Sequence, residues 1–140
     1  MTFLEILNMV RDTANTVNPT GTFVHGRNSD VAMAFGDPMP LIVLYPFEQR
    51  DDEDNITSEA DLTIGFYELD QGEQDTKIHE AQAVRMDNLC REFKDQLKTD
   101  FENEFTYRSN PRRGALGTGI IQGLIGFALE LSITTSFDEC

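Results

Sequence analysis

The densest group of potential metal ligands in the sequence is the acidic run Asp51-Asp52-Glu53-Asp54. Ca²⁺ prefers several carboxylate oxygens on one loop, and an EF-hand loop needs a glycine at position 6 and a glutamate at position 12. Counted from Asp51, these positions hold Ile56 and Leu62. The spacing therefore does not match a calcium loop, and we predict an acidic loop at 48–61 that faces solvent or a partner.

A second chemical possibility is phosphate binding by the glycines Gly114, Gly117 and Gly119. A P-loop requires a lysine followed by serine or threonine, and a dinucleotide-binding glycine loop lies between a strand and a helix. Here there is no nearby lysine, and the glycines precede a segment with the pattern of a strand. We therefore expect a mobile loop leading into that strand, and no cofactor.

The histidines and cysteines do not form a catalytic group by spacing. His25 and His79 are 54 residues apart, with no carboxylate or cysteine at ligand spacing. Cys90 falls within an apolar helical stripe, and Cys140 has no suggested base. Nucleophilic catalysis needs a serine or cysteine next to an oriented base. We predict no catalytic residue, no metal site and no enzymatic activity.

The basic residues are concentrated in Arg108, Arg112 and Arg113, within a basic loop rich in proline and glycine that we expect at 108–119. Two interpretations stay open: a solvated loop, or a contact in which the basic loop of one copy meets the acidic loop of the next. Head-to-tail contacts of the second kind close into rings when the rotation permits. The candidate subunit-interface residues are Arg108, Arg112, Arg113, Asp51, Asp52, Glu53 and Asp54.

Hydrophobic periodicity predicts the helices that would position these loops. Thr2 and Glu5 have the pattern of a capping box, and apolar residues at helical spacing behind it predict a helix from about 3 to 16. A similar apolar stripe predicts the longest helix, over about 77–98. Between them, Thr22–His25 and Val31–Phe35 are predicted as two short strands, in a hairpin or an irregular arm.

The predicted sheet is built from three further strands and one short one. Leu41–Tyr45 is continuously apolar, whereas Ala60–Tyr67 alternates, and we expect these two strands to pair antiparallel. Gln122–Thr135 also alternates, and a short strand is expected around Phe105–Tyr107. The expected fold class is α+β, with one mostly antiparallel β-sheet packed against the two helices, in a single domain of residues 1–140.

The charge of the chain limits its partners. The net charge is −14, and residues 48–75 hold eleven of the 25 acidic residues with only one basic residue. Such a field repels phosphate backbones over about 8–10 Å in physiological salt, so we do not expect the chain to grip nucleic acid. No membrane segment is expected either, because the apolar run before Glu130 is interrupted by Gln122 and is shorter than the ~20 residues that a spanning helix needs. The N-terminus lacks the pattern of a signal peptide, which indicates synthesis in a cytoplasm.

The order of these elements resembles the tail-terminator, tail-completion and neck-ring (head–tail connector) proteins of tailed bacteriophages. The similarity rests on the first helix, the paired strands in "PLIVLYPF" and "EADLTIGFYEL", the helix "HEAQAVRMDNLCREFKDQL" and the closing segment "GLIGFALELSITTSFDEC". It extends to chains of crAss-like phages of Bacteroidetes. It covers most of the chain and carries no catalytic motif.

The resemblance implies a structural virion protein, made in the host bacterial cytoplasm and assembled in the neck or tail. It implies a homo-oligomeric ring, sixfold or twelvefold, that contacts neighbouring neck, portal or tail proteins. DNA would pass through such a ring without specific binding, and an acidic lumen would suit that passage. The alternative function is a small acidic cytoplasmic binding module or inhibitor that acts on a basic partner protein.

Overall fold

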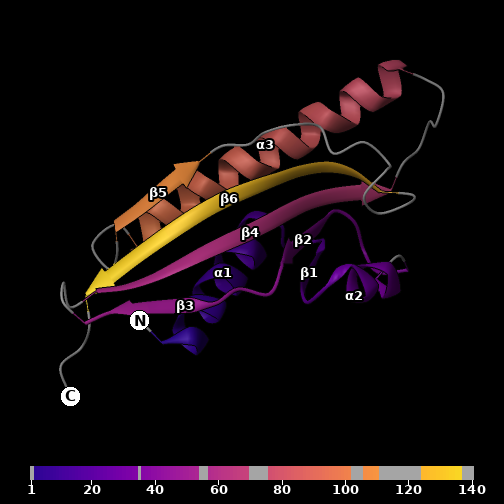
Figure 1. The fold of residues 1–140 in the computed structure, drawn as a ribbon. Coiled ribbons are helices and arrows are strands. Elements are labelled where there is room, and N and C mark those ends of the chain that lie inside the picture. Colours follow the sequence, from indigo (N-terminus) through magenta and orange to yellow (C-terminus); the bar gives the residue numbers. More distant parts are fainter. Residues whose placement is uncertain are drawn as a thin grey trace.

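The computed structural model describes residues 2–34, 36–53, 57–69, 76–101, 106–110 and 124–136. Its elements, in chain order, are α1 (Phe3–Val17), β1 (Thr22–His25), α2 (Asn28–Met33), β2 (Leu41–Leu44), β3 (Gln49–Asp52), β4 (Thr57–Leu69), α3 (Thr76–Phe101), β5 (Thr106–Asn110) and β6 (Leu124–Ser136) (Figure 1). The predicted α+β fold class is confirmed.

The sheet is organised around the pairing of β4 with β6. These two strands pair antiparallel along 13 residues each, from Thr57 opposite Ser136 to Leu69 opposite Leu124. The order across the sheet is β1-β2-β4-β6-β5, and β3 also pairs with β4. All pairs are antiparallel except β1 with β2. The predicted antiparallel pairing of Leu41–Tyr45 with Ala60–Tyr67 is confirmed, as the pairing of β2 with β4.

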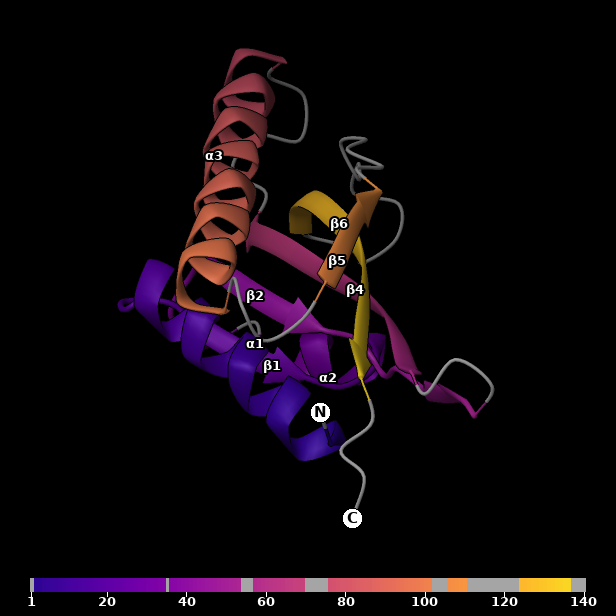
Figure 2. The ribbon, with the colours of Figure 1, turned by 90° about the vertical axis from the view of Figure 1, so that its left-hand side faces the viewer.

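Helices α1 and α3 lie together on one side of this sheet (Figure 2). The Thr2 hydroxyl accepts a hydrogen bond from the Glu5 amide at 3.2 Å, and the Glu5 carboxylate accepts one from the Thr2 amide, so the predicted capping box begins α1. The apolar stripes of both helices pack on the alternate residues of β4 and β6 that point to the same side. This main core contains Ile6, Val10, Ile42, Leu44, Leu62, Ile64, Phe66, Met86, Phe93, Leu97, Leu129 and Leu131, with others.

The prediction of a strand at Val31–Phe35 is wrong, because residues 28–33 form α2. The carboxylate of Asp30 accepts a hydrogen bond from the Arg27 amide at 2.9 Å, which satisfies a backbone donor at the start of the helix. Val31 and Ala34 stand three residues apart, and both are buried in a second, smaller core with Leu41 and Val43. Accordingly β1 does not form a hairpin with this segment, and it pairs in parallel with β2.

Candidate functional site

The two faces of the sheet differ in how they are covered. One face carries α1 and α3, whereas on the other face, among the described residues, the only helix is α2, which packs over β1 and β2. The remainder of that second face, over β3, β4 and β6, presents polar side chains at alternate positions. We call this surface the open face, formed by Arg50, Glu59, Asp61, Thr63, Glu130, Ser132 and Thr134.

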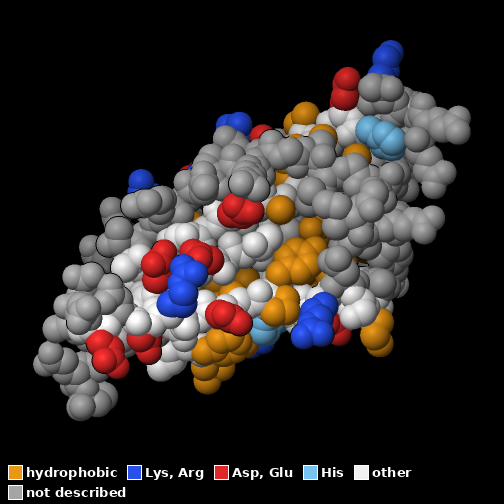
Figure 3. All heavy atoms as spheres, viewed as in Figure 1, with side chains coloured by type: hydrophobic (Ala, Val, Ile, Leu, Met, Phe, Trp, Pro, Cys, Tyr) orange, Lys and Arg blue, Asp and Glu red, His pale blue; other side chains and the backbone are white. Residues whose placement is uncertain are grey.

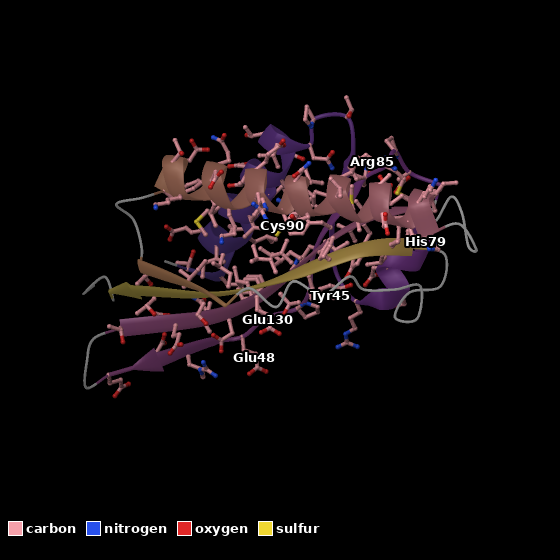
Figure 4. The ribbon with its side chains drawn as sticks, turned by 90° about the horizontal axis from the view of Figure 1, so that it is seen from above. Tyr45, Glu48, His79, Arg85, Cys90 and Glu130 are labelled. Carbon is pink, nitrogen blue, oxygen red and sulfur yellow. The ribbon has the colours of Figure 1, made fainter. Side chains whose placement is uncertain are left out.

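Acidic side chains predominate on this side of the molecule. Figure 3 views the sheet from the open face and shows carboxylates gathered around one basic side chain over β3 and β4. Figure 4 shows that Glu48 and Glu130 lie on the side of the sheet away from α3, while Cys90 lies between α3 and the sheet. The fold therefore segregates charge, because alternate residues of the same strands enter the core or join the acidic surface.

Asp61 is a carboxylate of the open face that contacts both neighbouring strands, β6 and β3. Its Oδ1 accepts a hydrogen bond from the Ser132 hydroxyl at 2.6 Å, across the β4–β6 pair. Its Oδ2 accepts one from Arg50 Nη2 at 2.7 Å, and the same guanidinium lies 3.8 Å from Glu59. The Ser132 hydroxyl, and secondarily Arg50, lower the pKa of Asp61. This carboxylate therefore remains charged at neutral pH.

The network around Asp61 holds its groups in place but adds little stability. About half of the Asp61 side chain and 64% of the Arg50 side chain are exposed. Exposed ion pairs contribute about 0–1 kcal/mol, because water and salt screen them. The network is therefore a fixed, hydrated, negatively charged surface.

Two tyrosines mark the boundary between the open face and the smaller core. The hydroxyl oxygens of Tyr45 and Tyr67 are 2.7 Å apart, and burial raises the pKa of both phenols. The ring of Tyr67 lies close over the main chain, because a side chain at Gly65 would meet the ring, and one at Gly126 would meet the ring and the carbonyl of Phe66. Both tyrosines therefore stay neutral, and they separate apolar packing from the acidic surface.

The acidic residues predicted as a loop belong to a β-hairpin. Asp51 and Asp52 lie in β3, opposite Ser58 and Thr57 of β4, and Glu53 begins the turn. Asp54 lies outside the described residues. The predicted loop at 48–61 is thus wrong in its extent, because backbone hydrogen bonding to β4 turns most of it into strand.

Among the three arginines predicted at a subunit interface, the structure describes only the backbone of Arg108. Arg108 lies within β5, opposite Ser132 of β6. The basic segment therefore starts as a strand, and the predicted loop at 108–119 begins too early. Arg112, Arg113 and the glycines up to Gly119 lie outside the described residues. Strands β4 and β6 separate β5 from β3, so one copy of the chain does not bring Arg108 and the β3 acids together.

The Asp61–Ser132–Arg50 network was not predicted from the sequence. The alternation in both strands places Asp61 and Ser132 on their polar faces, which was the available signal. Their contact depends on the register that aligns residue 61 with residue 132, 71 positions later in the chain. A period-two pattern defines faces but leaves the register open.

Other chemistry-bearing residues of the described ranges lie away from the open face. A shallow depression beside α3 contains Arg85, whose Nη2 lies 2.6 Å from Glu68 Oε1, and this pairing raises the pKa of Arg85. His25 packs near the rings of Phe3 and Phe47. Within the described part of the chain, no three His, Cys, Asp or Glu side chains are grouped to hold a metal ion.

The helices in the described ranges include none that is both long and apolar enough to cross a membrane.

Comparison with known proteins adds no family assignment. No protein-family model matches the chain, and no curated protein matches it either.

Proposed function

We propose that this chain is a structural virion protein, a ring-forming subunit of the joining region between the neck and tail of a tailed bacteriophage. In this role it is a tail terminator or head–tail connector, and DNA passes through the ring. The observation that carries the proposal is the open face, a charged sheet surface opposite the face that α1 and α3 bury; among the described residues, no helix packs on it.

The open face has the properties that a channel wall for DNA requires. Glu59, Asp61 and Glu130 outnumber Arg50 on it, and the lowered pKa of Asp61 keeps that carboxylate charged. Like charges repel over about 8–10 Å at physiological ionic strength, so a phosphate backbone near this surface slides without adhering. We therefore place the open face toward the axis of the ring, with α1 and α3 on its outer side.

A long β-strand pair also suits the mechanical task. The 13-residue pairing of β4 with β6 forms a stiff platform whose core face is filled by large apolar side chains. A ring that carries a passing polymer must keep its diameter, and a close-packed interior resists compression. The open face then needs no catalytic group, since the function is to present charge at a fixed radius.

Electron microscopy tests this proposal. Purified protein and virions are imaged, and we expect discrete rings, sixfold or twelvefold, whose map places β4 and β6 at the lumen. A monomer that persists at high concentration by light scattering, together with virions that lack the chain in the neck and tail, contradicts the proposal. A ring with α1 and α3 at the lumen contradicts the assignment of the open face.

The same acidic surface also fits the second candidate, a cytoplasmic module that binds a basic partner protein. Complementary charge would then steer association, with a strong dependence on salt. Co-purification from host cells distinguishes the two. A basic protein that is retained at low salt and released at high salt, in the absence of rings, favours the binding module.

A further inference from the structure

Two of the described edge strands of the sheet, β3 and β5, lie at the same level on opposite sides of the β4–β6 pair. Among the described strands, β3 pairs only with β4, and β5 pairs only with β6. The register aligns Arg50, Glu59, Thr134 and Thr106 in one row across the four strands β3, β4, β6 and β5. Figure 1 shows β3 and β5 flanking the same end of the β4–β6 pair. Edge strands of this kind are templates for pairing with another chain.

The two edge segments carry opposite charge. Residues 48–54, which contain β3, include five acidic residues and one basic residue. β5 itself, Thr106–Asn110, includes Arg108 and no acidic residue, and the sequence that follows it adds Arg112 and Arg113, which lie outside the described residues. Pairing β3 with β3 of a second copy would oppose like charges, and so would pairing β5 with β5, whereas pairing β3 with β5 brings opposite charges together.

Strand direction also favours pairing of unlike edges. The three pairings β3–β4, β4–β6 and β6–β5 are all antiparallel, so β3 and β5 run in opposite directions. Rotation about an axis roughly along the strands preserves strand direction in each copy. Placing β5 of one copy beside β3 of its neighbour therefore creates another antiparallel pair. Antiparallel pairing is slightly more stable than parallel pairing. The same contact can repeat between every two neighbouring subunits.

We infer that copies of this chain join head to tail, with β3 of one copy pairing antiparallel with β5 of the next. The four-stranded blocks then form one continuous sheet around the ring, with every open face on the same side. This inference rests on the proposed ring function and names the joint that would build it.

Disulfide cross-linking tests the joint directly. Within one chain, β3 and β5 are separated by three strand spacings, or about 14 Å, which exceeds the ~7 Å limit between the Cα atoms of a disulfide. Any bond between them must therefore join two copies. Cys90 is fully buried, so a Cys140→Ser background leaves no other exposed thiol.

In that background, Asp51→Cys or Asp52→Cys is combined with Arg108→Cys or Ser109→Cys, which gives four double variants that sample both sides of the sheet. After oxidation, we expect at least one double variant to give a ladder of oligomers on a non-reducing gel, and the matching single variants to stay monomeric. Single variants that form dimers would indicate like-edge pairing and overturn the inference. Circular dichroism of the reduced variants confirms that each is folded.

A charge exchange provides the second measurement. Two variants each reverse the charge of one edge: Arg108→Glu, and the double variant Asp51→Arg/Asp52→Arg. In each, the protein concentration at which half of the chains are assembled should rise about tenfold or more. A chain that carries all three substitutions should assemble again. Combined variants that assemble no better than either parent overturn the inference.

The failure of this joint and the failure of the ring function give different results. Rings that form without any cross-linked ladder reject this joint but keep the ring function. A ladder from open filaments, without rings, keeps the joint and rejects the ring function.

Discussion

The rings of Phe66 in β4 and Phe93 in α3 meet edge to face, with their centroids 5.5 Å apart and their planes at 67°. Both side chains are fully buried in the main core. This contact fixes the long helix to the central strand of the sheet. The platform beneath the open face therefore depends on it.

Removing this contact tests how far the platform depends on α3. Phe93→Ala should lower the free energy of unfolding by about 3–5 kcal/mol, because it removes buried apolar surface and leaves a cavity. Urea denaturation followed by circular dichroism gives the value. Val84→Ala is the matched control, since Val84 lies in the same helix but is 58% exposed, and we expect a change of about 0.5 kcal/mol or less. Equal losses in the two variants would contradict the packing described here.

Gly126 is expected to tolerate no side chain. A Cβ there would meet the carbonyl of Phe66 in the paired strand and the ring of Tyr67, so Gly126→Ala should destabilise the fold by about 1–3 kcal/mol. Thermal unfolding measures the difference. Gly36→Ala is the control because, apart from its chain neighbours, no described residue has an atom within 4 Å of the added Cβ, and it should be neutral or slightly stabilising. A neutral Gly126→Ala variant would show that Tyr67 does not lie over this position.

Much of the fold was predictable because its elements have strong hydrophobic periods. The apolar stripes of α1 and α3 and the alternation in β4 and β6 each follow from a pattern of 3.6 or 2 residues. The segment around Val31 is too short to show a hydrophobic period. Its helix is instead stabilised by the Asp30 hydrogen bond at its start and by packing against β2. β3 was also missed, since a polar strand without alternation gives no periodic signal.

The candidate site was less predictable than the fold. Charge composition identified the acidic segment around Asp51 and the basic segment around Arg108, but their separation at opposite sheet edges depends on strand order. The hydrogen bond between Asp61 and Ser132 depends on register. Strand order and register are long-range properties, so a pattern of local composition does not determine them.

The pH dependence of Asp61 tests the network on the open face. The Ser132 hydroxyl is the largest cause of its lowered pKa, and Arg50 is a smaller one. Ser132→Ala should therefore raise the pKa of Asp61 toward its ordinary value of about 3.9, and Arg50→Met should raise it as well. NMR titration of the Asp61 carboxyl carbon measures both shifts.

The sign of the stability effect follows from the same pKa. A carboxylate whose pKa is lowered by folding contributes stability above its unfolded pKa, and this contribution disappears as the pH falls through its folded pKa. Between neutral pH and about pH 5, Ser132→Ala should therefore be less stable than the wild type, and the difference should shrink under more acidic conditions. Thr63→Ala, on the same face, should leave the pKa of Asp61 unchanged. An unchanged pKa of Asp61 in Ser132→Ala would contradict the assignment of the Ser132 hydroxyl as the largest single cause.

Positive charge on the open face tests its proposed position at the DNA channel. Thr63→Lys/Thr134→Lys adds two cations to that face without removing any of its carboxylates, and Ala81→Lys/Asn88→Lys adds two cations to the exposed surface of α3. In virions we expect the first pair to slow DNA ejection and lower the infectious titre at least tenfold, because the added lysines attract the passing phosphates. The second pair should have little effect, although both carry the same net charge.

Two controls accompany this comparison. Electron microscopy must show intact rings for both variants. Equal titres for the two pairs would contradict a channel lined by the open face, and higher salt during ejection should relieve the defect of the first pair if attraction to phosphate causes it.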